Sequence, residues 1–234
     1  MPASRKNTAI AANPEDDYTA EPFLPAKVGR GKAGLRALRE AAEECRGCPL
    51  HRNTTGTVFG DGDPHARVLI IGEQPGDQED RRGEPFVGPA GRVLDRALEE
   101  AGIDPARSYV TNAVKHFKFE YASGGRGKRR IHKAPSLREM TACGPWLAAE
   151  LALLAPEVIV VLGATAGKAL FGSSFRVTRE RGELIEREVH GRSERLVATI
   201  HPSAVLRADD EDRDDVREGL VSDLRVAAAA LRSG

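Results

Sequence analysis

The apolar residues of this chain fall into short continuous runs that alternate with longer segments of helical spacing. The first run, RVLIIG at residues 67–72, is typical of a buried parallel strand because it is almost entirely apolar. Similar runs predict strands at 108–114, 157–163 and 195–200. Apolar positions three and four residues apart predict helices at 34–45, 90–102, 136–154, 164–171 and 213–231.

This alternation predicts an α/β fold with a central, mainly parallel four-stranded sheet and helices on both faces. In such sheets, ligands bind beyond the carboxyl ends of the strands. The polar residues at those ends are Glu73, Gln74, Asn112 and His201. We therefore expect a site at this edge of the sheet. A structural role stays open for each residue; Glu73, for example, is equally able to cap backbone N–H groups in a turn.

The first part of the chain differs from the rest in its pattern. Residues 1–33 are polar and aperiodic, which predicts a mobile tail, followed by one domain at residues 34–234. The N-terminus lacks the apolar segment of a signal peptide, and no run approaches the roughly 18 apolar residues of a membrane span. These features predict a cytoplasmic protein without a membrane partner.

Charge is balanced in total but not along the chain. Lys plus Arg and Asp plus Glu number 35 each, so any attraction to a polyanion has to be local. Between residues 115 and 138, eight basic residues are opposed only by Glu120, whereas residues 208–215 read ADDEDRDD. The stretch GGRGKRRIHKAP, residues 124–135, is either a solvated surface loop or a phosphate-binding loop that carries His132.

The segment GEQPGDQEDRRGEPFVGPAG, residues 72–91, is rich in turn-forming glycine and proline. It has neither the GK[ST] ending of a phosphate-binding loop nor a GxGxxG fingerprint, so no nucleotide cofactor is expected. Phe86 lies within it, in a chain with only 5% aromatic residues. On a loop, this ring either stacks on a planar ligand or fills a gap in the core.

Cys45 and Cys48 form a CxxC pair, and Cys143 stands alone. An odd number of cysteines in a reducing compartment argues against a disulfide scaffold. Three cysteines are one ligand short of a [4Fe–4S] cluster or a structural zinc site. His116 is the best fourth candidate, because imidazole replaces thiolate in some iron–sulfur sites. A zinc site or three buried thiols remain alternatives.

Taken together, several of these motifs resemble a known family. GEQPGDQEDRRGEPFVGPAG, VTNAVKH and HPS, with CRGC upstream and Cys143 downstream, resemble the iron–sulfur uracil-DNA glycosylases of family 4. KRRIH is most similar to the UdgX branch of that family. The resemblance covers residues 40–231. It implies the uracil-DNA glycosylase fold and a structural [4Fe–4S] cluster held by Cys45, Cys48, His116 and Cys143.

The resemblance also implies roles for the candidate site residues in binding a uracil that has been flipped out of the strand. Phe86 would stack on the base, Asn112 would read its edge, and His201 would stabilise charge on O2. Glu73 would stabilise the cationic sugar or activate the group that attacks it, as in glycoside hydrolysis. Gln74 and Asp80 would position His132 or its loop. The residues expected to hold DNA phosphates are Lys128, Arg129 and Arg130.

In the UdgX branch, the resemblance implies that His132 attacks C1′ and stays bonded to the sugar. Uracil-containing DNA, with single strands preferred, would be the substrate of a single-turnover, monomeric enzyme. One alternative is a conventional family 4 enzyme that turns over with water. Another is a DNA-binding iron–sulfur module or redox sensor without catalysis.

Overall fold

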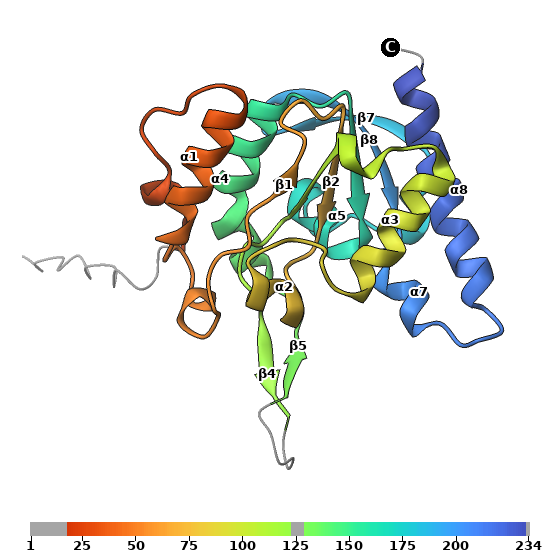
Figure 1. Cartoon of the computed structure of the whole chain (residues 1–234), viewed down its shortest axis with the longest axis horizontal. Helices are drawn as coiled ribbons and strands as arrows, with labels where there is room; N and C mark the ends of the chain where they lie inside the picture. The colour runs from red at the N-terminus through yellow and green to blue at the C-terminus, as the bar shows by residue number, and fades with distance from the viewer. Residues whose placement is uncertain (1–17, 123–128, 233–234) are drawn as a thin grey trace, which may run out of the picture.

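The chain folds around one six-stranded sheet with helices packed against both faces (Figure 1). The computed structural model describes residues 18–122 and 129–232. The strand order across the sheet is β1-β3-β2-β6-β8-β7. The four inner strands run parallel and correspond to the four predicted apolar runs. They are β3 (Ser108–Asn112), β2 (Val68–Gly72), β6 (Val158–Leu162) and β8 (Arg192–Thr199).

The predicted number of four strands was wrong, because the sheet has two more at its edges. β1 (Asp61–Gly62) pairs antiparallel with β3, and β7 (Leu184–Val189) pairs antiparallel with β8. β1 has two exposed residues, and β7 alternates exposed and partly buried positions. Neither strand is buried on both faces, so neither has the continuous apolar run that marks an inner parallel strand.

The helices form two layers, one on each face of the sheet (Figure 1). On one face, α3 (Pro89–Ala101) and α8 (Arg213–Arg232) pack against Val68 and Ile70 of β2. On the other, α1 (Gly31–Glu43), α4 (Leu137–Leu154) and α5 (Gly163–Phe171) share a cluster with Leu69 and Ile71. Alternate residues of one strand thus supply both cores.

Short helices connect these elements. They are η1 (Glu21–Phe23), η2 (Pro49–Arg52), α2 (Asp77–Arg82), η3 (Pro105–Arg107), α6 (Val177–Glu180) and α7 (Ser203–Arg207). Among the described helices, none combines the length and the apolar character needed to cross a lipid bilayer.

A third buried cluster lies between α1 and α4 and contains Cys45, Cys143 and Trp146. Ala20 belongs to it and donates its backbone N–H to the carbonyl of Ala142 at 2.8 Å. Part of the segment predicted as a tail therefore packs against the domain. Residues 1–17 lie outside the described residues.

The basic stretch predicted as a loop contains a strand. β4 (Phe119–Tyr121) and β5 (Arg130–His132) form an antiparallel hairpin that projects from the body of the domain (Figure 1). Its strands have only three residues each, and no apolar run marks them. Lys128 lies outside the described residues.

Candidate active site

Gly72, the last residue of β2, forms the floor of the candidate site. A Cβ atom added there would lie 2.4 Å from Oδ1 of Asn112 and 2.6 Å from Cζ of Phe86. The sheet register pairs Gly72 with Asn112 at the carboxyl ends of β2 and β3. The predicted amide and the predicted aromatic ring therefore meet above a position that only glycine can occupy without displacing them.

Phe86 has a backbone φ of +58°, a left-handed conformation that is rare for a bulky residue. The N-terminal turn of α3 holds it there, since a Cβ on Gly91 would overlap the carbonyl oxygen of Phe86. The Phe86 ring stacks on the ring of His201 with centroids 6.4 Å apart and planes at 26°. Backbone strain of this kind is concentrated at ligand sites. It favours a ligand-contacting role for Phe86, which stays a prediction.

His201 follows β8 and is oriented by residues of α7. The backbone N–H of Ser203 donates to Nδ1 of His201 at 3.2 Å, so Nδ1 is an acceptor. The Ser203 hydroxyl lies 2.7 Å from the same nitrogen and accepts from Nη1 of Arg207 at 2.8 Å. Burial, followed by the charges of Arg207 and His132, lowers the pKa of His201 to about 4. Near neutral pH, His201 is therefore an uncharged imidazole that carries its proton on Nε2.

His132 and Glu73 approach each other between the hairpin and the end of β2. Nε2 of His132 lies 3.5 Å from Oε1 of Glu73, and half of the His132 side chain is exposed. Oε1 is buried and has no hydrogen-bond partner among the described residues. A buried carboxylate oxygen without a donor is costly, so the site is arranged to receive a positively charged or proton-donating group at this atom.

Gln74 connects the hairpin to the sheet. Its Oε1 accepts the backbone N–H of Lys118 at 3.0 Å, which fixes the orientation of the amide. Its Nε2 donates to the carbonyls of Lys118 and Lys133, and it lies 2.9 Å from Nε2 of His132. An amide nitrogen only donates, so Nε2 of His132 presents its lone pair. The two amide hydrogens of Gln74 thus face three acceptors.

The prediction that Asp80 positions the His132 loop is consistent with its contacts. Asp80 is buried and accepts from Thr55 and from Nη1 of Arg130, the latter at 2.5 Å. Arg130 also donates to Asp77, and its guanidinium stacks over Phe119. Arg130 was predicted to bind phosphate, but in the structure its charge is already neutralised by two carboxylates. Arg129 is exposed, and its phosphate contact stays a prediction.

The three cysteines are buried and free. Cys45 and Cys143 belong to the third cluster, and Cys48 is close enough to act on Cys143 electrostatically. The indole N–H of Trp146 donates to Sγ of Cys45, and the backbone N–H of Lys115 donates to Sγ of Cys143, both at 3.3 Å. Donors of this kind are typical around metal-bound sulfur. Burial raises the pKa of Cys143 to about 12, so the thiol keeps its proton near neutral pH and a bound metal would have to displace it.

His116 is also buried, and burial, followed by the neighbouring His51, lowers its pKa to about 4. It is thus in the neutral form that a metal ligand requires. The chemistry of the four predicted ligands fits an iron–sulfur cluster. Within residues 18–122 and 129–232, however, no group of three or more His, Cys, Asp and Glu side chains is arranged to hold a metal ion.

The sequence did not indicate which residues orient the candidate site residues. Ser203 and Arg207 orient His201, and their spacing of two and six residues after it would have been a usable signal. Glu79 accepts the backbone N–H groups of Gly76 and Gly88, which closes the loop before α3. A carboxylate three residues after a turn glycine is common on helices, so its second partner was not visible in the sequence.

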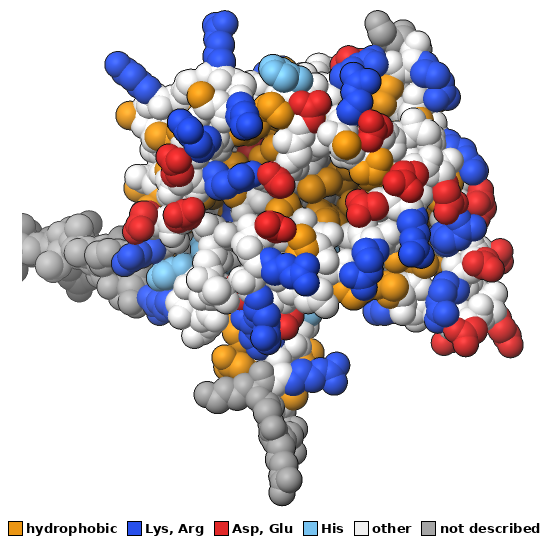
Figure 2. Space-filling model, in the orientation of Figure 1, with side chains coloured by type: hydrophobic (Ala, Val, Ile, Leu, Met, Phe, Trp, Pro, Cys, Tyr) orange, Lys and Arg blue, Asp and Glu red, His pale blue; other side chains and the backbone are white. Residues whose placement is uncertain are grey.

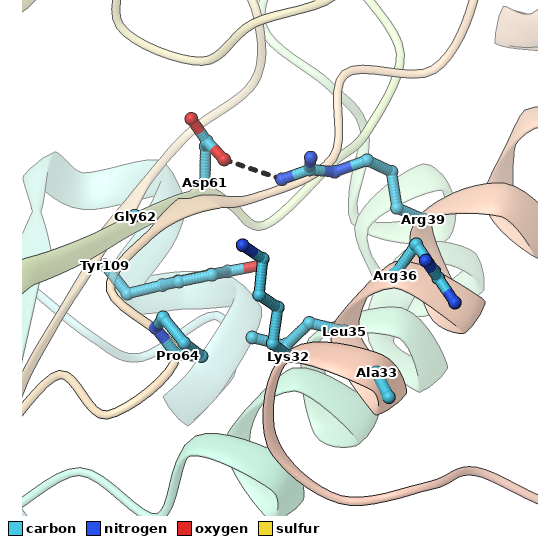
Figure 3. A pocket seen from close by; sticks show the side chains of 9 residues that line it. All are labelled: Lys32, Ala33, Leu35, Arg36, Arg39, Asp61, Gly62, Pro64 and Tyr109. Carbon is cyan, nitrogen blue, oxygen red and sulfur yellow. Dashed lines mark hydrogen bonds and ion pairs between the residues drawn. The ribbon is translucent and has the colours of Figure 1, made fainter.

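The structure also has a cavity away from the candidate site. A cavity of about 600 Å³ lies between α1 and β1, where Arg39 donates to Asp61 at 2.7 Å (Figure 3). Its lining, as far as the described residues define it, includes none of the predicted site residues. Acidic side chains gather around the turn between α7 and α8, away from the hairpin (Figure 2). Elsewhere on this face, basic and acidic side chains are mixed (Figure 2).

Comparisons with known proteins point to one family. The model of the uracil DNA glycosylase superfamily matches residues 59–225. The chain is 33% identical to the type-4 uracil-DNA glycosylase of Thermotoga maritima over 199 residues, which is 85% of this chain and 95% of the relative. It is also 33% identical to the type-4 enzyme of Pyrobaculum aerophilum over 177 residues, or 74% of this chain and 85% of the relative. A type-5 enzyme from Thermus thermophilus is 36% identical over 117 residues, 48% of this chain and 53% of the relative.

Proposed function

Since this chain belongs to the uracil-DNA glycosylase superfamily, we propose that it removes uracil from DNA and keeps the sugar as a covalent adduct on His132. The chain is a uracil-DNA glycosylase, like the type-4 relatives that it matches over most of their length. The finer part of the proposal is the nucleophile. The approach of Nε2 of His132 to the unpartnered Oε1 of Glu73, at 3.5 Å, is the observation that supports it.

Binding begins when the uracil of a flipped nucleotide reaches Phe86 and Asn112, which meet above Gly72. Asn112 ends a strand there, and its amide offers both a donor and an acceptor to the edge of the base. The Phe86 ring offers a face for stacking. Single-stranded DNA is the proposed substrate of choice, because extracting a base from a duplex costs a few kcal/mol of pairing and stacking.

Cleavage breaks the bond between C1′ and N1, and the electron pair leaves with the uracil. The negative charge that builds on O2 faces the Nε2–H of neutral His201, which donates without first having to lose or gain a proton. The sugar becomes an oxocarbenium-like cation. The buried Oε1 of Glu73, which lacks a donor among the described residues, is the group that can stabilise this cation.

Nε2 of His132 then forms a bond to C1′ with its lone pair. In the tautomer that the amide of Gln74 favours, with the proton on Nδ1, the attack needs no base. The product is an imidazolium whose remaining proton, on Nδ1, passes to solvent, and the uracil anion takes a proton to leave as uracil. Holding the nucleophile beside the cation gives it a large advantage over bulk water.

We also propose that Cys45, Cys48, His116 and Cys143 hold a [4Fe–4S] cluster with a structural role. The buried thiols and the neutral imidazole support this assignment. Lys115 connects a proposed cluster ligand to a proposed uracil-binding residue. Its backbone N–H donates to Sγ of Cys143, and its Nζ donates to the carbonyl of Asn112 at 2.9 Å. Visible absorbance and an iron assay on purified protein would distinguish this cluster from zinc.

The proposal is tested by incubating the protein with single-stranded DNA that carries one deoxyuridine, followed by a denaturing gel. We expect a shifted band that survives heat and detergent, and its loss in His132→Ala. His65→Ala removes an exposed histidine at the other end of the sheet and should keep the shift. Alkali-labile DNA without a shifted band would instead indicate turnover with water. An adduct that persisted in His132→Ala would exclude His132 as the nucleophile.

A further inference from the structure

The hairpin that carries His132 also carries a row of aromatic rings. Phe117 is buried, its ring stacks on Phe119 with centroids 5.1 Å apart, and Phe119 meets Tyr121 edge to face at 5.3 Å. Tyr121 is 54% exposed and is the only exposed Phe, Tyr or Trp side chain in the described part of the chain. The row therefore begins in the core and ends in solvent.

The register of the hairpin places the exposed end of this row on the same face as His132. Directly paired residues of two antiparallel strands share a face. The pairs are Phe119 with His132, Tyr121 with Arg130, and Glu120 with Ile131. Tyr121 thus stands two residues further along β4 than the partner of His132, a separation of about 7 Å along the strand. Ile131 points to the opposite face.

Arg130 holds this face of the hairpin in place. Its guanidinium lies 4.9 Å from the centroid of Phe119 and 5.3 Å from that of Phe117. The same group is fixed by its ion pairs with Asp77 and Asp80. The aromatic row is consequently anchored to α2, and Tyr121 has a supported position rather than that of a loose surface residue.

We propose that Tyr121 is a stacking subsite for the nucleobase next to the flipped deoxyuridine in single-stranded DNA. The inference rests on the proposed function, because it places the flipped nucleotide at His132. A base adjacent to a flipped nucleotide has lost a stacking neighbour, and an exposed aromatic ring at this distance replaces it. Stacking of this kind accepts any base, so Tyr121 contributes to strand binding and not to the choice of uracil.

The test places the fluorescent base 2-aminopurine on either side of the deoxyuridine, in two separate oligonucleotides. With the wild-type protein, we expect quenching on binding for one of the two positions. Tyr121→Ala should abolish this quenching and weaken binding of the strand about 10-fold or more, whereas Tyr121→Phe should retain both. Uracil release from saturating substrate should change little, because Tyr121 contacts neither the uracil nor C1′.

Two controls separate stacking from folding of the hairpin. Ile131→Ala removes an apolar side chain, 44% exposed, from the opposite face of the hairpin and should bind like the wild type. An oligonucleotide with an abasic site at the quenched position should weaken wild-type binding to the Tyr121→Ala level and should not weaken Tyr121→Ala further. Equal losses in Tyr121→Ala and Ile131→Ala, or no loss in either, would overturn the subsite. If uracil were not released by the wild type, the proposed function itself would fail.

Discussion

His132 and His201 face the same site, but their surroundings differ in almost every respect. The hydrogen bonds that orient His201 come from within six residues of its own position, through Ser203 and Arg207, and the residue is partly buried. His132 is half exposed on a three-residue strand. Its position depends on residues far away in the sequence, among them Gln74, which is 58 residues away. The hydrogen bonds of one histidine are local, and those of the other are long-range.

This difference suits the two roles proposed for them. A donor to the leaving uracil works best when its protonation and position are fixed before the substrate arrives. A nucleophile that forms a bond to C1′ has to move toward the sugar during the reaction. The hairpin that carries His132 is anchored at Arg130, and Gln74 contacts His132 from the residues that follow β2.

The largest expected effect comes from releasing the anchor of the hairpin with Arg130→Met. The buried Asp80 would lose its ionic partner, which weakens the hairpin by about 2–3 kcal/mol. Exchange of the backbone amides of Ala122 and Lys133, which close the hairpin, should then rise roughly 30- to 150-fold.

Arg129→Met is the matched control, because Arg129 is exposed and forms no ion pair that the structure describes. Similar exchange in both variants would mean that Asp80 does not anchor the hairpin. The adduct should form more slowly in Arg130→Met alone.

A smaller effect is expected from lowering the pH, and it concerns His201. The pKa of His201 is about 4 in the folded protein and about 6.5 in the unfolded chain. At a pH between these two pKa values, His201 binds a proton in the unfolded chain but not in the folded protein. The free energy of unfolding therefore falls as the pH falls. From pH 7 to pH 5, this histidine should reduce the free energy of unfolding by about 2 kcal/mol.

Urea unfolding of the wild type and of His201→Asn at both pH values isolates this contribution. The variant lacks the titrating ring, so its loss of stability from pH 7 to pH 5 should be about 2 kcal/mol smaller. Equal losses in the two proteins would show that His201 accepts a proton in the fold, and would remove the basis for a neutral donor.

Which parts of the fold could be predicted from the sequence depends on the same distinction between local and long-range structure. The inner strands were predictable because residues such as Ile70 and Val160 are buried on both faces and form continuous apolar runs. The hairpin was not, because its short strands depend on Gln74 and Arg130 and on partners that no local pattern reveals. Arg130 was predicted to bind phosphate, and its ion pair with Asp80 is a contact that the sequence does not show.

The same distinction decided which candidate site residues could be predicted from local sequence patterns. Glu73, Asn112 and His201 were predicted as site residues because the carboxyl ends of parallel strands meet at one edge, which the fold class alone predicts. Phe86 and His132 came from the resemblance to a family, since neither a loop phenylalanine nor a histidine among basic residues indicates a role by itself. The support from Glu79 and Lys115 became visible only through contacts across the fold.

The smallest expected effect tests how much of the fixation of His201 is due to one hydroxyl. Ser203→Ala removes the group between Arg207 and Nδ1 of His201 but keeps the backbone N–H that donates to the same nitrogen. One hydrogen bond contributes about 1 kcal/mol, so single-turnover uracil release should slow about fivefold with unchanged DNA affinity. Ser203→Thr retains the hydroxyl and should release uracil at nearly the wild-type rate. If Ser203→Ala released uracil as fast as the wild type, the backbone N–H of Ser203 alone would orient the His201 ring. The orientation of His201 would then depend on the backbone conformation more than on any side chain.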